Sequence, residues 1–269
     1  MALGAGAEAR VAPPHSTAPA SSPALQDDVP APPAKEVVER AVKALKVGLS
    51  AKEPAQRIAA LQLAAEVVHR DVVKAITEAL GDDATEVRDF TIDLLGKIED
   101  PSALAALHAY AKKNRRTLPD EPELYVLLLK SISRHGEPSS IELLTDKFFE
   151  TDHHLVIRAR ILGLANIRDK RAVETLFELM TKTDRRKVTP HIGEFQLALN
   201  VLLGVDVGKN QDRWVAWWND NKRSFKVLEA MPKLAAESLT AWEQHWGLER
   251  TYARNKKRGD RGKDPEGGK

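Results

Sequence analysis

The sequence contains no cysteine, so it cannot form a disulfide, a thiolate metal site or a cysteine nucleophile. A chain without cysteine is compatible with the cytoplasm and with an exported compartment alike. Neither sign of charge dominates, because 41 Lys and Arg residues accompany 39 Asp and Glu residues. This near balance argues against a dedicated nucleic-acid-binding domain, which usually concentrates basic residues on one face.

Long apolar runs and the motifs of common active sites are also missing. No run approaches the ~20 apolar residues that a membrane-spanning helix needs. There is no Gly-x-Ser-x-Gly elbow and no His-Glu-x-x-His pair. The best histidine cluster, Asp152-His153-His154, is explained more simply as a capped helix start than as a metal site. The sequence therefore nominates no catalytic residue, no metal ligand and no cofactor.

The first 34 residues form a separate segment that is rich in alanine and proline. They hold seven of the 15 prolines and show no apolar periodicity. Such a segment cannot bury enough apolar surface to offset the entropy of ordering, so we predict that residues 1–34 are disordered. Two interpretations stay open. The segment is the remnant of a shortened export leader, since an intact one would need a basic start and a continuous apolar stretch, or it is a plain cytoplasmic tail.

Helical patterning begins at Lys35 and then repeats. The stretches Ile98–Leu104, Ile132–Pro138 and Ile167–Val173 each close one apolar helix and open another through a polar turn. Pro101 and Pro138 are 37 residues apart, and Glu137 and Asp169 are 32 apart. Self-similarity at a period of about 20–50 residues is typical of a solenoid.

Apolar residues at spacings of three and four predict five helical hairpins between residues 35 and 205. Gly81 is predicted to end one of the helices in a left-handed conformation. The predicted first and second helices of the hairpins are 35–49 with 54–68, 72–80 with 87–98, 101–111 with 124–132, 138–148 with 157–165, and 169–180 with 195–202.

An acidic turn followed by an apolar residue and arginine recurs in these hairpins. Asp83 precedes Val87-Arg88, and Asp152 precedes Ile157-Arg158, whereas Leu124-Tyr125 interrupts the pattern in the middle hairpin. Over about residues 35–205 the chain resembles HEAT repeats, particularly the short bacterial kind found with phycobilin lyases. The resemblance implies an all-α, right-handed α-solenoid of about five hairpins, armadillo-like, with one concave face. It also implies that Arg88 and Arg158 bond an aspartate in a neighbouring turn.

All five tryptophans lie after residue 210, in the predicted segment 206–248. Trp214, Trp217 and Trp218 share one helical face, and Trp242 and Trp246 share another. A solenoid exposes an apolar end, which large rings can cover, so we interpret the segment as a Trp-rich C-terminal cap. The alternative is an aromatic platform for a base, a sugar or a peptide.

The last predicted segment, residues 249–269, is basic and has no apolar period, which predicts disorder. Its basic residues include Arg254, Lys256, Lys257 and Arg258. Such a tail either keeps the protein soluble or binds phosphates through counterion release.

A stack of hairpins offers a long surface rather than a dry catalytic cleft. We therefore expect a non-catalytic scaffold that binds a protein or peptide through its concave face, with no small-molecule substrate evident. The candidate contact residues are Arg88, Arg158, Arg160, Trp217 and Trp218. The second hypothesis is a nucleic-acid binder, with the cradle of HEAT-like DNA glycosylases or with help from the basic tail. Its charge would come from Arg57, Arg88, Arg115, Arg116, Arg158 and Arg160. The third, by fold analogy alone, is an enzyme resembling bilin lyases.

Overall fold

The computed structural model describes residues 33–151 and 153–248, and every regular element in these ranges is a helix. The predicted disordered segments, residues 1–34 and 249–269, fall outside the described residues except for Pro33 and Ala34. Within the described ranges, no helix combines the length and the apolar character needed to cross a membrane.

Ten helices pair into the five predicted hairpins, and two further helices follow them. Short connecting helices interrupt the loops: η1 (Glu78–Gly81), η2 (Leu118–Asp120), η3 (Pro138–Ser140), α10 (Arg185–Val188) and η4 (Thr189–His191). The hairpins are α1 (Lys35–Leu49) with α2 (Pro54–Ala65), α3 (Arg70–Thr77) with α4 (Thr85–Leu95), α5 (Pro101–Lys113) with α6 (Pro122–Arg134), α7 (Ile141–Thr145) with α8 (His154–Ala165), and α9 (Lys170–Lys182) with α11 (Ile192–Leu203).

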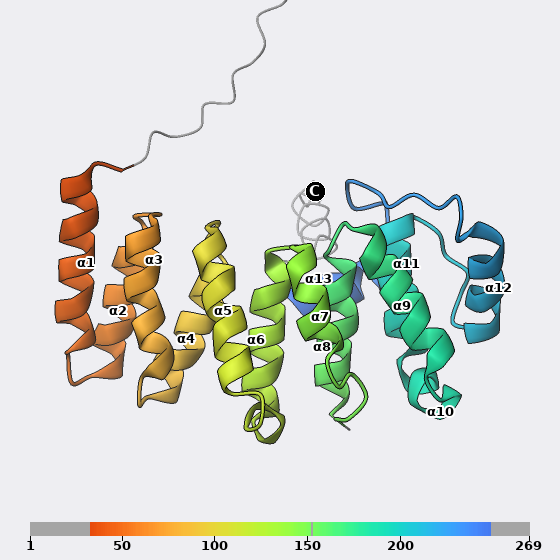
Figure 1. Cartoon of the computed structure of the whole chain (residues 1–269), viewed down its shortest axis with the longest axis horizontal. Coiled ribbons are helices and arrows are strands. Elements are labelled where there is room, and N and C mark those ends of the chain that lie inside the picture. Colours follow the sequence, from red (N-terminus) through yellow and green to blue (C-terminus); the bar gives the residue numbers. More distant parts are fainter. Residues whose placement is uncertain (1–32, 152, 249–269) are drawn as a thin grey trace, which may run out of the picture. The chain divides into compact units, whose positions relative to one another are not determined.

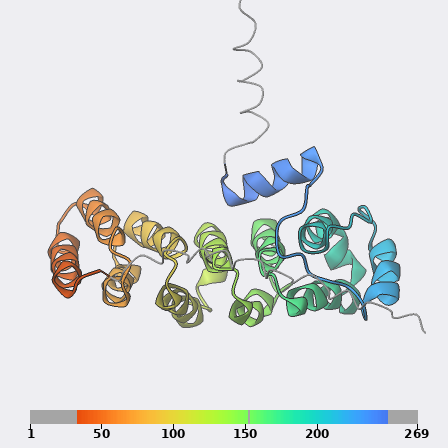
Figure 2. The ribbon, with the colours of Figure 1, turned by 90° about the horizontal axis from the view of Figure 1, so that it is seen from above.

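The hairpins lie side by side in order, which places their helices in two rows (Figures 1 and 2). The first helices, α1, α3, α5, α7 and α9, form the A row. The second helices, α2, α4, α6, α8 and α11, form the B row, in which each helix packs on the next. The second and third hairpins separate the first from the fourth. The prediction of an all-α solenoid is therefore confirmed.

Local chemistry explains where several helices begin. The Asp100 side chain accepts a hydrogen bond from Ser102 N at 2.8 Å, and Pro101 takes the first helical position of α5. The Asp169 side chain accepts one from Arg171 N at 2.7 Å at the start of α9. A carboxylate at the N-cap satisfies an N–H that has no partner inside the helix, and proline has no N–H to lose there. These starts are where the repeated polar turns predict them.

Several local predictions differ from the structure. The predicted helices 54–68 and 87–98 each run three residues past the observed ends of α2 at Ala65 and α4 at Leu95. Gly81 is not left-handed, because the chain tightens there into the 3₁₀ turn η1, so that prediction is wrong. The predicted helix 138–148 is also too long. Pro138 opens the 3₁₀ turn η3, and α7 ends at Thr145, where Lys147 takes a positive φ of 51°. Arg160 Nη1 donates to Asp146 O at 2.5 Å, which stabilises this early turn.

The core consists of two apolar clusters that meet at α6. Leu124, Leu128 and Ile132 belong to the cluster of the first three hairpins, whereas Leu129 belongs to the cluster that continues to the last described helices. Tyr125 packs against both clusters. One helix thus joins two halves of the row, at the hairpin where the Val-Arg pattern is interrupted.

The two tryptophan helices lie in different places. Helix α12 (Gln211–Asn221) packs against α9, at the end of the A row. Helix α13 (Ala236–Trp246) instead returns along the chain and lies over the B row near α6, α8 and α11 (Figure 2). We call the outward side of the B row, whose helices carry the candidate residues Arg88, Arg158 and Arg160, the B face.

Candidate functional site

Buried arginines connect the turns inside the hairpins. Arg57 Nη1 donates to the carbonyl oxygens of Ala51 and Lys52, and Arg57 Nη2 bonds Asp82 at 2.8 Å and Asp83 at 3.0 Å in the next hairpin. Asp82 accepts from Ala84 N as well. Burial alone would raise the pKa of Asp82, but these hydrogen bonds and the charge of Arg57 lower it below its usual value.

Arg88 also holds a turn, through hydrogen bonds from Nη1 to the carbonyl oxygens of Asp82 and Asp83 in its own hairpin. The predicted side-chain bond to a neighbouring aspartate is made by Arg57 instead. Arg57 and Arg88 share one feature: each donates hydrogen bonds to backbone carbonyl oxygens in the turn that precedes its helix. This donation occupies Arg88 Nη1, one of the nitrogens that a partner would contact.

The fourth hairpin repeats this arrangement with Arg160. Arg160 is 3% exposed, and it donates to Asp146 O in its own turn and to the Tyr125 hydroxyl at 2.6 Å. Its guanidinium also lies over the rings of Tyr125 and Phe148. Arg160 is therefore the structural counterpart of Arg88, two positions beyond the Arg158 that sequence alignment suggests. Tyr125 stands where the middle hairpin lacks the arginine of the pattern, and its hydroxyl accepts the hydrogen bond from Arg160 of the next hairpin.

Alignment of α4 and α8 on these two arginines reveals a difference on the B face. Asp93 of α4 corresponds to Ala165 of α8, and the half-buried Phe90 corresponds to the fully buried Leu162. Helix α8 itself carries apolar residues on all sides, and those that are fully buried include Ile161, Leu162, Leu164 and Ala165. A helix that is apolar all round is covered on every side, and α13 supplies the additional cover.

Helix α13 contacts the B row through its side chains and through the backbone carbonyl oxygen of Ala241, which accepts a hydrogen bond. Arg158 Nη2 donates to Ala241 O at 3.2 Å. Leu162 of α8 and Leu197 of α11 line a narrow cavity of about 290 Å³ together with Ser238 and Ala241 of α13. Four α13 side chains are buried, each less than 10% exposed: Trp242, Glu243, His245 and Trp246.

His245 brings a titratable group into this interface. Burial, together with the positive charges of Lys130, Arg158 and Arg134, lowers its pKa to about 3. The imidazole is therefore neutral at pH 7. Lys130 and Arg134 extend from α6 and Arg158 from α8, so three cations surround the docked helix.

Next to these cations, the B face between α4 and α6 is polar, and none of the described helices lies over it (Figure 2). Arg134 Nη1 and Lys97 Nζ both bond Asp93, each at 2.5 Å. Burial alone would raise the pKa of Asp93, but the hydrogen bonds and charges of Lys97 and Arg134 lower it below its usual value. Lys130 lies close enough to this group for Arg134 and Asp93 to influence its pKa, which burial lowers.

The predicted aromatic site residues Trp217 and Trp218 lie on α12, away from α13. Trp218 stacks on Phe177 of α9 with ring centroids 4.3 Å apart, and Trp217 stacks on the same ring at 6.0 Å. Trp214 is fully buried beside them and donates from Nε1 to Gly208 O. Both candidate rings thus have a partner inside the protein, and the structure does not bring them together with Arg88, Arg158 or Arg160.

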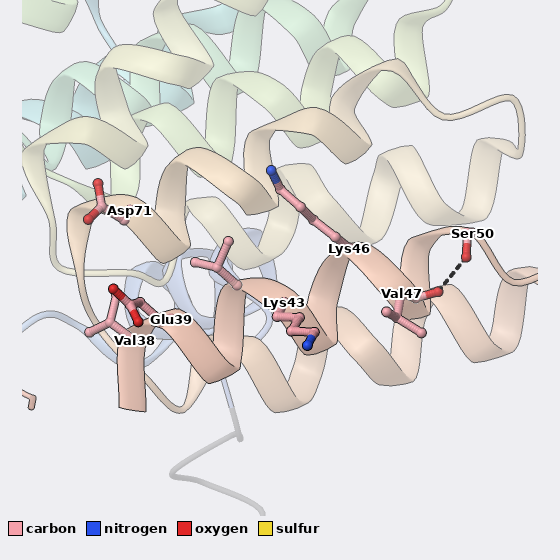
Figure 3. A pocket seen from close by; sticks show the side chains of 8 residues that line it. Val38, Glu39, Lys43, Lys46, Val47, Ser50 and Asp71 are labelled. Atoms are coloured by element: carbon pink, nitrogen blue, oxygen red, sulfur yellow. Dashed lines mark hydrogen bonds between the residues drawn. The ribbon is translucent and has the colours of Figure 1, made fainter. Parts of the chain in front are cut away.

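A hollow of about 600 Å³ lies at the opposite end, along α1 (Figure 3). Its labelled side chains follow α1, with only Asp71 contributed by α3. Val47 is 67% exposed there, and Lys43, Lys46 and Glu39 accompany it. Apart from Ser50 and Asp71, these residues form one flank of the first helix.

The other candidates add no chemistry. In the ranges that the structure describes, no group of three or more histidine or acidic residues could hold a metal ion. His153 and His154 stack with ring centroids 5.7 Å apart at the start of α8, and the side chain of His153 does not cap the helix. Asp152 and the tail residues Arg254, Lys256, Lys257 and Arg258 lie outside the described residues.

Sequence reasoning missed the position of α13, although a signal was present. The uniform apolar character of α8 indicates a third contact layer, and α13 has two tryptophans on one face. Proximity in sequence favoured a cap on the last hairpin instead. His245, Lys130 and Arg134 were missed for the same reason, because they come together only when α13 folds back.

Comparison with known proteins supports the repeat assignment. Residues 42–121 match the family model described as HEAT repeats, which covers the region from α1 to the beginning of α6. The later hairpins continue the same two rows. No curated protein matches the chain.

Proposed function

Because the chain is a HEAT-repeat protein, we propose that it is a non-catalytic scaffold that binds a protein or peptide partner through its B face. One observation carries this proposal: α13 of the same chain already lies on that face. The B row therefore offers a surface that accepts a polypeptide helix. A face built from one helix of every hairpin suits an extended partner better than a small substrate.

Charge placement favours this function over nucleic-acid binding. Arg57 and Arg160 are buried, with 8% and 3% of their surfaces exposed, and they bond groups within the protein. Arg88 holds its own turn. The rings of Trp217 and Trp218 stack on Phe177. The residues that would contact phosphates or bases are thus largely occupied by internal contacts.

A matched pair of charge reversals tests the proposed face in the full-length protein. Lys97→Glu with Lys130→Glu changes the B face, whereas Lys112→Glu with Lys113→Glu changes exposed residues of α5 in the A row. After nuclease treatment of a native lysate, we expect wild type and the A-row variant to retain the same protein partner. The B-face variant should lose it.

Two outcomes contradict the proposal. One is a partner that is lost equally from both variants or from neither. The other is a retained species that disappears with nuclease, accompanied by a salt-dependent gel shift with duplex DNA, which would favour the nucleic-acid hypothesis.

A further inference from the structure

The surface under α13 is apolar at its centre. Leu162 is fully buried and Leu197 is 6% exposed, and both line the cavity below Ala241. The rings of Trp242 and Trp246 lie 5.6 Å apart, one helical turn from each other, and both are buried. Large aromatic side chains at i and i+4 therefore anchor this helix.

The edge of the same surface is positively charged. Lys130, Arg134 and Arg158 all act on His245, the buried histidine of α13. Asp93 bonds Arg134, which leaves an excess of positive charge on this part of the B face. A helix with a carboxylate near its anchors complements such a surface better than a neutral or basic one. In α13, Glu243 is buried between the two tryptophans in sequence and has a partner within the protein.

The fit of α13 to this surface is incomplete. Three nitrogens are buried without a hydrogen-bond partner: Arg158 Nε, His245 Nε2 and Trp246 Nε1. A buried donor that loses its bond to water without replacement weakens an interface. Within the described chain, α13 also lacks the close backbone packing that joins α6 to α8 and α8 to α11. His245 and Trp246 belong to α13, so only Arg158 Nε would remain on the row, and a helix that offers it an acceptor would bind more tightly than α13.

The connection to α13 would let it leave without disturbing the row. Leu228 N bonds Leu202 O at 2.8 Å and fixes the chain to α11. Between Leu228 and α13 the chain has no helix, and most of its residues, including Glu229 and Met231, are exposed. A short tether of this kind holds a helix at an effective concentration in the millimolar range.

From these features we propose that the B face over α6, α8 and α11 is a docking site for a partner's amphipathic helix, which displaces α13. This partner helix carries two large aromatic side chains one turn apart and an acidic residue near them. Helix α13 occupies the site in its absence. The inference rests on the proposed function and specifies the chemistry of its partner. A partner must overcome the tethered helix, so binding is selective for helices that satisfy Arg158 and the neighbouring cations.

The test uses a fluorescent peptide of residues 233–248 as the probe and the full-length protein as the receptor. Wild type should bind the peptide weakly, because the tethered copy competes. Trp242→Ala with Trp246→Ala should bind it at least tenfold more tightly, since its own α13 no longer docks. Trp218→Ala in α12 is the matched control and should behave as wild type.

A second variant avoids any change to a buried side chain. About 20 Gly and Ser residues inserted after Lys233 lengthen the tether roughly fourfold and lower the effective concentration about eightfold. Affinity for the peptide should rise by the same factor. A peptide with alanine in place of both tryptophans should not bind, and Lys130→Glu should weaken binding about tenfold.

The inference is overturned if the insertion leaves peptide affinity unchanged, or if no variant binds the peptide. In either case the charge-reversal experiment judges the proposed function separately. If binding of a protein partner still depends on Lys97 and Lys130, the scaffold function stands, and only the proposed displacement of α13 is wrong.

Discussion

Helices α4 and α8 occupy equivalent places in the row but present different B faces. On α4 the face is polar, with Asp93 bonded to Lys97 and Arg134, and no helix among residues 33–151 and 153–248 lies over it. On α8 the equivalent position is Ala165, and α13 covers the surface nearby. One repeat pattern thus specifies the fold in both places, while the outward residues decide which stretch of the face acquires another layer.

The largest expected effect concerns the buried ion pair between α2 and the turn before α4. Arg57→Ala removes the buried ion pair with Asp82, whose side chains are each 10% exposed. Breaking such a pair leaves a buried charge without its partner and typically costs about 3–5 kcal/mol. We expect a loss of this size in the free energy of unfolding from urea titration.

The control for Arg57 is an exposed pair elsewhere in the chain. Arg185 bonds Asp212 with side chains 62% and 68% exposed. Such pairs contribute about 0–1 kcal/mol, so Arg185→Ala should hardly change the unfolding free energy. Equal losses from the two variants would show that burial does not distinguish these pairs.

A smaller effect is expected where α8 packs on α6. A Cβ at Gly163 would lie 2.2 Å from Ser133 Oγ and 3.2 Å from Ser133 Cβ. Because Ser133 Oγ is bonded to Leu129 O, Gly163→Ala should destabilise the protein by about 1–3 kcal/mol through overpacking. Thermal unfolding measures the change.

Gly81→Ala is the matched control, because nothing lies within 4 Å of its Cβ position and its φ is not positive. It should be neutral or slightly stabilising. The combination of Ser133→Ala with Gly163→Ala should recover part of the loss. If Gly163→Ala alone is neutral, the close approach of α6 and α8 is incorrect.

The smallest effect is a pH dependence of α13 docking. Docked His245 has a pKa of about 3, whereas a released imidazole has its ordinary value of about 6.5. The released state binds more protons between these values, so docking weakens as pH falls below about 6.5. From pH 7 to 5.5 the released fraction should rise roughly eightfold, or about 1.3 kcal/mol.

Hydrogen exchange of residues 236–246 reports this release locally. The charged groups that act on His245 are Lys130 and Arg134 of α6 and Arg158 of α8. His245→Gln should remove most of the pH dependence. If exchange at pH 5.5 rises equally in this variant, another group is responsible. Burial also lowers the pKa values of His108, His135 and His191, which makes a global melting curve a less specific readout.

Local pattern was enough to predict most of the row. Apolar spacing located the hairpins, and Asp100 and Asp169 marked helix starts because an N-cap needs only residues next to it. The exchange of roles between Arg158 and Arg160 was not predictable, because the turn before α8 is longer than the turn before α4. Arg160 donates to Asp146 O, 14 residues earlier, whereas Arg88 donates to oxygens five and six residues earlier. The place of α13 depends on contacts with α6 and α8. The apolar character of α8 signals an additional layer but does not identify the helix that supplies it.

The most direct measurement of the central claim is the distance between α13 and the B row in solution. The chain has no cysteine, so spin labels can be attached at Glu123→Cys in α6 and Gln244→Cys in α13, both of which are exposed. Pulsed electron–electron double resonance should show a short distance between the two labels for docked α13. When excess peptide 233–248 is added, the population with a longer distance should increase. A single short distance that the peptide does not change would contradict the account.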